Sequence, residues 1–125
     1  MTILRTLFIT LTLSTFAAAC GGSSDDSGVD KNKKVTSLSA DEKMSFCTWS
    51  TATQGGEGKT TMCSANTSVT VHTTAECVSG FASLSSTCMA TVSQFEACIR
   101  AEAAKPCDGL GSSACEPVIA CLPAT

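Results

Sequence analysis

The chain has 125 residues, with eight Lys and Arg against eleven Asp and Glu, and a formal net charge of −3. This length has room for one small domain and short additional segments. The sequence contains no basic patch, so we expect neither nucleic acid nor an anionic membrane surface as an electrostatic partner.

The first nineteen residues have the pattern of an export signal. Arg5 is their only charged residue, an apolar run follows it, and three alanines precede Cys20. A charged start, a short apolar stretch and a small-residue cleavage site are typical of signal peptides. The apolar run is shorter than the roughly 20 residues that a membrane-spanning helix needs. We therefore expect residues 1–19 to be removed.

The residues from Phe16 to Cys20, with three alanines between them, resemble the lipobox of bacterial lipoproteins. They depart from it at Ala17, where that family prefers Leu. The resemblance implies that Cys20 receives a diacylglyceryl group on its sulfur, that cleavage occurs just before it, and that the new amino terminus is acylated. The membrane would then be a partner through lipid on Cys20. Ordinary signal peptidase also accepts Ala-x-Ala, and a freely secreted protein is the alternative.

The number of cysteines supports lipidation. The chain has nine Cys, and an odd number in an exported protein needs an explanation. If Cys20 carries lipid, the remaining eight can form four structural disulfides, as expected outside the cytoplasm. These eight are Cys47, Cys63, Cys77, Cys88, Cys98, Cys107, Cys115 and Cys121.

Spacing does not fix the pairing, because eight cysteines allow roughly a hundred arrangements. One pair is predicted, Cys77–Cys98, on the assumption that two helices form an antiparallel hairpin turning near residue 88. No two cysteines are close enough for a typical zinc site, and the chain has one His. We therefore expect no metal and no cofactor.

Composition divides the exported part in two. Residues 20–34 are rich in Gly, Ser and charged side chains and contain almost nothing apolar, so we expect a disordered tether. Residues 35–125 form the predicted domain. The lipobox, the tether and the cysteine spacing over 77–107 together resemble small cysteine-rich lipoproteins of Gram-negative bacteria. In such proteins Gly21, rather than Asp, after the lipidated cysteine implies delivery to the outer membrane.

The domain is expected to be mainly α, small, disulfide-rich and helical. Capping-box patterns and apolar stripes mark the helices. About four helices are predicted, over 39–54, 74–86, 91–104 and 113–122. A strand over 44–51 is the alternative to the first helix. The segment 57–73 contains several β-formers and is predicted to be either a loop or a short β-hairpin.

No set of residues in the sequence indicates catalysis. His72 is the only His and lies in a polar stretch, where a solvent-facing loop position is expected. Glu96 and Glu102 are expected on the solvated face of the third helix. No Ser lies in a GxSxG motif. We therefore predict no catalytic residue and no enzyme, with an envelope hydrolase as the least favoured alternative.

The segment Gly58-Lys59-Thr60 matches the end of a phosphate-binding loop. The full motif requires Gly five positions before Gly58, where Thr53 stands. We interpret the segment as a surface loop.

These features predict a membrane-anchored extracytoplasmic lipoprotein of the cell envelope that acts as a non-catalytic binding or structural module, with an envelope protein as possible partner. The alternative is a carrier of a small apolar ligand, or an inhibitor of an extracytoplasmic enzyme. A carrier requires a cavity, and the residues expected to line it are Phe81, Phe95, Ile99 and Leu110.

Overall fold

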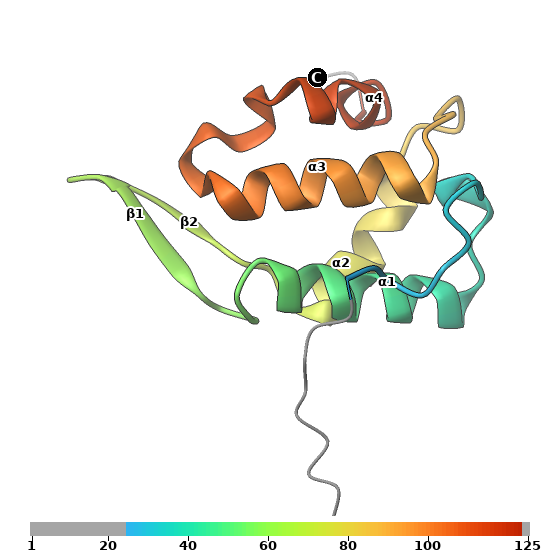
Figure 1. The fold of residues 1–125 in the computed structure, drawn as a ribbon, viewed down its shortest axis with the longest axis horizontal. Helices are drawn as coiled ribbons and strands as arrows, with labels where there is room; N and C mark the ends of the chain where they lie inside the picture. Colours follow the sequence, from blue (N-terminus) through green and yellow to red (C-terminus); the bar gives the residue numbers. More distant parts are fainter. Residues whose placement is uncertain (1–24, 124–125) are drawn as a thin grey trace, which may run out of the picture.

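The computed structural model describes residues 25–123 as a mainly α, small, disulfide-rich domain (Figure 1). The expected signal peptide 1–19 and the predicted lipidation site Cys20 lie outside the described residues. The elements are α1 (Ala40–Thr53), β1 (Thr60–Ser64), β2 (Thr67–Thr70), α2 (Thr74–Gly80), α3 (Val92–Ala104) and α4 (Glu116–Ile119). Short 3₁₀ helices lie at Val35–Ser37, Phe81–Ser83, Pro106–Gly111 and Ser113–Cys115.

Helix α1 starts at the capping box that the sequence predicts. The Glu42 backbone N–H donates to Ser39 Oγ at 3.2 Å, and the Ser39 N–H donates to the Glu42 carboxylate at 2.8 Å. These bonds satisfy donors that a helix start leaves free. The chain then turns at Gly55, whose φ of 104° would strain any side chain. The predicted range 39–54 is confirmed, and the strand over 44–51 is wrong.

Helix α2 is shorter than the predicted range 74–86. The 3₁₀ helix Phe81–Ser83 follows it, and the backbone is extended at Leu84, with φ −67° and ψ 141°. The Ser85 N–H donates to the carbonyl of Cys121 at 2.9 Å. A bond to a distant segment therefore replaces the next helical bond.

Helix α3 confirms the predicted range 91–104. The helix stops at Lys105, whose φ of −139° and ψ of 72° are not helical, because Pro106 disfavours helical backbone in the residue before it. The helix predicted over 113–122 is instead a 3₁₀ helix followed by the short α4. Pro117, at the start of α4, has no N–H to donate across that junction.

The segment 57–73 contains a β-hairpin, one of the two predicted alternatives. Strands β1 and β2 are antiparallel, with Thr60 opposite Thr70 and a register shift between Met62 and Ser64. Every residue of β2 is exposed, and the hairpin is held to the domain through Cys63 of β1.

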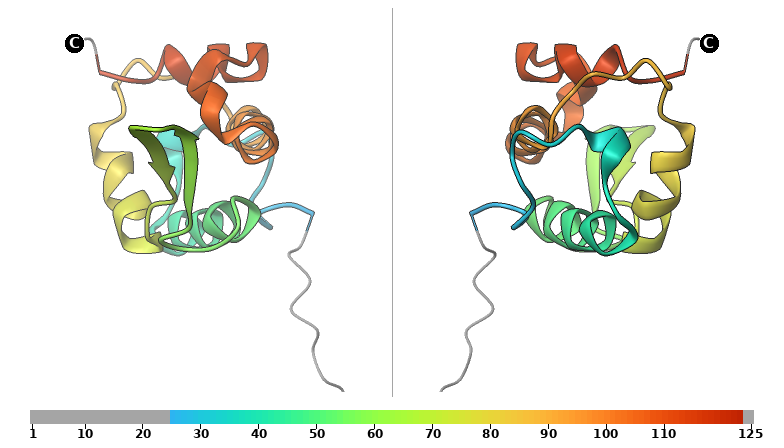
Figure 2. Two further views of the ribbon diagram at one scale, coloured as in Figure 1. Left: turned by 90° about the vertical axis from the view of Figure 1, so that its left-hand side faces the viewer. Right: turned by 90° about the vertical axis from the view of Figure 1, so that its right-hand side faces the viewer.

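All eight predicted domain cysteines are in disulfides, but the predicted pair Cys77–Cys98 is wrong. Helix α2 packs against α1, and α3 packs against the C-terminal helical turns, so α2 and α3 do not form the assumed hairpin. Figure 2 shows α2 and α3 at opposite sides of the domain, with α1 along its base. The disulfides are Cys47–Cys77, Cys63–Cys107, Cys88–Cys121 and Cys98–Cys115.

Residues 25–34 pack onto the domain, whereas their composition predicts part of a disordered tether. Ser27 and Val29 are each 7% exposed. Ser27 donates two hydrogen bonds to the buried carboxylate of Glu96, one from its N–H and one from its hydroxyl. The hydrogen bonds to Glu96 of α3 thus hold in place a segment that has little apolar surface of its own. The folded part therefore begins before residue 35.

The core lies where α1, α2 and α3 meet. Phe46 of α1 is 2% exposed, and its ring packs against the rings of Trp49, Phe81 and Phe95. Among residues 25–123, no helix combines the length and the hydropathy needed to cross a bilayer.

Candidate functional site

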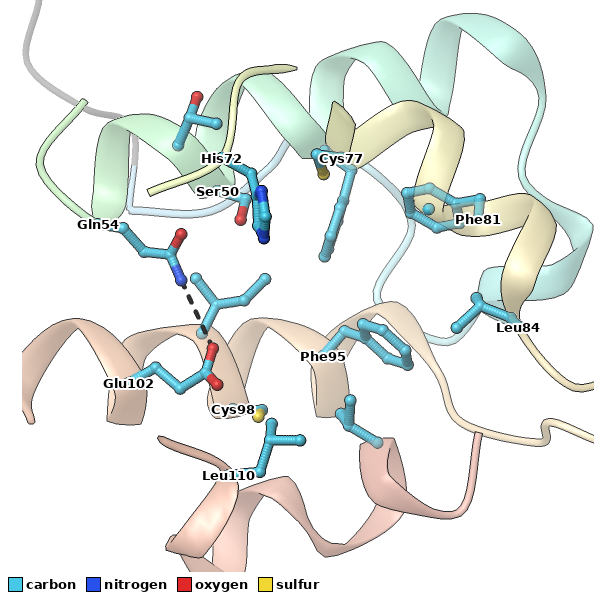
Figure 3. A pocket seen from close by; sticks show the side chains of 15 residues that line it. Ser50, Gln54, His72, Cys77, Phe81, Leu84, Phe95, Cys98, Glu102 and Leu110 are labelled. Atoms are coloured by element: carbon cyan, nitrogen blue, oxygen red, sulfur yellow. Dashed lines mark hydrogen bonds between the residues drawn. The ribbon is translucent and has the colours of Figure 1, made fainter. Parts of the chain in front are cut away.

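A cavity of about 240 Å³ lies between α1, α2 and α3 (Figure 3). It contains all four residues that the sequence analysis assigned to the walls of a ligand-binding cavity. These are Phe81, Phe95, Ile99 and Leu110. The cavity opens to solvent on one side, since His72 and Gly80 of its lining are exposed, and its lining is mostly apolar.

Aromatic rings form one wall of the cavity. The ring of Phe46 meets the ring of Phe81 edge-on, with centroids 5.8 Å apart and an interplanar angle of 84°. Phe95 meets Phe46 at 6.3 Å and 70°. Such edge-to-face contacts hold rings in fixed orientations. This wall is therefore a shaped surface, and Leu84 and Val118 extend it.

The opposite end of the cavity is polar. Gln54 follows α1, His72 precedes α2, and Glu102 lies in the last turn of α3. Figure 3 shows these three side chains together at one end, and Phe81, Leu84 and Phe95 towards the other. The Gln54 Nε2 donates to Glu102 Oε2 at 3.5 Å, which is long for a hydrogen bond. The cavity is thus amphipathic along its length.

Glu102 is half-buried, which differs from the solvated position that the sequence predicts. Burial raises the pKa of its carboxyl above the ordinary value of 4.5. Glu96 also differs from its prediction. It is 1% exposed, accepts both bonds from Ser27, and lies 3.2 Å from the Arg100 guanidinium. One glutamate therefore lines the cavity, and the other fastens the amino-terminal segment.

A second cavity, also of about 240 Å³, lies between the β-hairpin and the end of α3. It shares Gln54, His72 and Glu102 with the first. The three side chains therefore stand between an apolar cavity and a more polar one beneath the hairpin. The disulfide Cys63–Cys107 fixes the hairpin to the segment after α3.

His72 is exposed, as predicted, and also lines both cavities. Its side chain is 81% exposed, and its Nδ1 lies 3.6 Å from Glu76 Oε2. The acid nearest the His72 ring is thus Glu76, one turn further along the chain. Among the described residues, no Ser hydroxyl is hydrogen-bonded to the His72 ring, so a Ser–His–acid arrangement is not formed there.

The sulfurs of Cys98 and Cys115 and the carboxylate of Glu102 lie within 4.8 Å of one another. This grouping resembles a metal site only in distance, because the two sulfurs are bonded to each other. A disulfide offers no thiolate, the form of sulfur that binds zinc.

Sequence reasoning missed the contribution of α1 to the site. Phe46, Ser50 and Gln54 are spaced four residues apart and all line the cavity. This spacing places them on one helical face. This four-residue spacing was the signal from which the sequence could have grouped the three side chains. Comparison of the chain with protein-family models, curated proteins and solved structures gives no match.

Proposed function

We propose that this protein is a lipid-anchored extracytoplasmic binding module that carries a small apolar ligand in its central cavity. The observation that supports this proposal is the cavity of about 240 Å³ between Phe81, Phe95, Ile99 and Leu110. An apolar protein cavity of roughly 150 Å³ is enough to bind benzene. One aromatic ring with a short substituent therefore matches the available space.

The disulfides support a binding role. Cys77 and Cys98 line the cavity, and their bonds to Cys47 and Cys115 fix opposite walls of it. Walls that hold their shape without ligand reduce the entropy lost on binding.

The anchor follows from the predicted lipid on Cys20. A lipid with two or more acyl chains on one residue would hold the domain at a membrane durably, since each buried methylene contributes about 0.8 kcal/mol. The first described residues are fastened to α3 by Ser27 and Glu96. The domain would therefore stay close to the surface that the lipid enters.

The test is mass spectrometry of the protein isolated from the cells that make it. For the anchor, we expect a mature chain that starts at Cys20 and carries diacylglyceryl and acyl groups. An unmodified Cys20 or a retained signal peptide would contradict the anchor. For the carrier, we expect a small molecule to leave the protein when its disulfides are reduced under denaturing conditions. A protein that releases none, and takes up no neutral aromatic probe, would contradict the carrier.

A further inference from the structure

We propose that the cavity selects a cationic amphiphile, whose apolar body lies among the phenylalanines and whose ammonium head binds Glu102. This inference rests on the proposed carrier function and names the class of ligand. Its basis is the charge distribution at the polar end of the cavity.

Glu102 is the acidic side chain among the described residues that line the cavity. An ionised carboxylate can accept about four hydrogen bonds. Among the described residues, Glu102 has one partner, the amide of Gln54 at 3.5 Å. A half-buried carboxylate with one long hydrogen bond retains unused acceptors at the cavity wall. An ammonium group supplies three donors and the opposite charge.

The carboxyl ends of two helices add to the negative charge near Glu102. Helices α1 and α3 both end at this side of the cavity, because Gln54 caps the end of α1 and Glu102 lies in the last turn of α3. A helix carries roughly half a negative charge at its carboxyl end. Neither helix has a basic residue in its last turn to offset that charge. Two helix ends and one carboxylate thus place negative charge at this end of the cavity.

The basic side chains of the described residues lie outside the two cavities or beside an acid other than Glu102. Among the described residues, no Lys or Arg lines either cavity. Two lysines do lie just beyond the helix ends. Lys59 lies over Gly55, and Lys105 pairs with Asp108 at 3.8 Å. Neither reaches the cavity lining. The His72 ring does line the cavity, but its Nδ1 lies 3.6 Å from Glu76 Oε2, so the place for a positive charge beside Glu102 is open to a ligand.

The charge of the head group decides which amphiphile the cavity favours. A fatty acid or another anionic amphiphile would place its negative head against Glu102, where like charges repel. A neutral alcohol would gain the apolar contacts and one ordinary hydrogen bond. An amine gains the apolar contacts and a charge-assisted hydrogen bond, which is about twice as strong.

The experiment compares three probes that share a phenyl ring on a two-carbon chain and differ in the charge of the head group. They are 2-phenylethylamine, 2-phenylethanol and phenylacetate. Calorimetric titration uses the protein as isolated from its envelope, after exhaustive dialysis. We expect the amine to bind roughly tenfold more tightly than the alcohol, and phenylacetate to bind most weakly. Glu102→Gln should remove the preference for the amine and leave the affinity for the alcohol unchanged. Asp41→Asn, which removes one exposed negative charge in the first turn of α1, at the opposite end of that helix from Gln54, is the matched control and should retain the preference.

The titrations distinguish failure of the ligand class, of the role of Glu102 and of the carrier function. If the alcohol binds and the amine binds no better, the ligand class is wrong while the carrier function stands. If Glu102→Gln keeps the preference for the amine, the role of Glu102 is wrong. If no probe binds, both the ligand class and the carrier function are wrong.

Discussion

Ser27 and Glu96 lie 69 positions apart in the chain and are joined by two hydrogen bonds. The N–H of Ser27 donates at 2.9 Å and its hydroxyl at 2.7 Å, both to Glu96 Oε1. The other carboxylate oxygen faces Arg100, which also donates to the carbonyl of Asp25. This small network closes the amino-terminal segment against α3.

Removal of the buried carboxylate should loosen that segment. Glu96→Ala leaves the Ser27 donors and the Arg100 guanidinium without their partner, and an unsatisfied buried donor costs about 1–3 kcal/mol. We expect a loss of stability of that size in urea unfolding, together with faster hydrogen exchange over residues 25–34. Ser93→Ala, on the exposed side of α3, is the control and should change stability by less than about 0.5 kcal/mol. Unchanged exchange over 25–34 in the Glu96 variant would show that the network does not hold the segment.

The four disulfides should differ in their resistance to reduction. Cys107 is exposed, whereas Cys47, Cys88, Cys98, Cys115 and Cys121 are each at most 3% exposed. Thiol exchange requires access to a sulfur. Mild reductant followed by alkylation and peptide mapping should therefore label Cys63 and Cys107 first. Earlier labelling of Cys98 and Cys115 would contradict the burial of that pair.

The cavity can be filled from its wall. Val118 lines it, and Val118→Phe would place a ring in the empty space. We expect affinity for neutral aromatic probes to fall at least about tenfold, and stability to change by less than about 1 kcal/mol, because the extra atoms occupy a void. Val35→Phe is the matched control. Val35 is fully buried and does not line the cavity, so overpacking there should cost about 1–3 kcal/mol. Equal destabilisation by both changes would indicate that no void exists beside Val118.

Stability should depend on pH through Glu102 and Glu42 in opposite senses. Burial raises the pKa of Glu102, so the folded state holds its proton more tightly than the unfolded chain does. This carboxyl therefore disfavours folding increasingly as pH rises above the ordinary pKa of 4.5. Glu102→Gln should be more stable than the wild type near neutral pH, and the difference should vanish in acid.

The control for that prediction is Glu42→Gln. The Lys33 ammonium, and then the Ser39 N–H, hold the pKa of Glu42 below its usual value. Its stabilising effect is present near neutral pH and is lost as pH falls through the folded-state pKa. Glu42→Gln should therefore be less stable than the wild type near neutral pH, with a difference that shrinks in acid. Urea unfolding at several pH values measures both variants, and the same sign for the two would contradict these assignments.

Local signals predicted the helices well. The capping boxes at Ser39, Thr73 and Thr91 are all present, and helices begin just after each of them. A cap depends on residues three positions apart, which the sequence shows directly. The ends of α2 and α4 were harder to predict, because a bond from Ser85 to the Cys121 carbonyl and the ring of Pro117 interrupt the helices.

Long-range pairing was not readable from the same signals. Cys77 and Cys98 each lie on a predicted helix face, but the sequence of a helix does not show which other helix it packs against. Because α2 packs against α1, Cys77 pairs with Cys47. Ser27 gives no local sign that Glu96 will bind it, and Glu96 therefore looked like a solvated residue. Phe95 and Ile99 of the cavity were predictable because they lie on the apolar stripe of α3, and Phe81 because it continues the apolar face of α2. Its polar end was not, because Gln54 and Glu102 meet only after α1 and α3 have packed.

The central claim is that the cavity binds a small apolar molecule. The most direct measurement is a titration of the isolated protein with 2-phenylethanol, followed by NMR of the side-chain methyl and ring signals. We expect saturable shifts at the cavity residues Phe81, Phe95, Ile99 and Leu110, with the methyl groups of Val35 unaffected. Shifts that are absent at saturating probe, or that spread evenly over the exposed methionines, would contradict it.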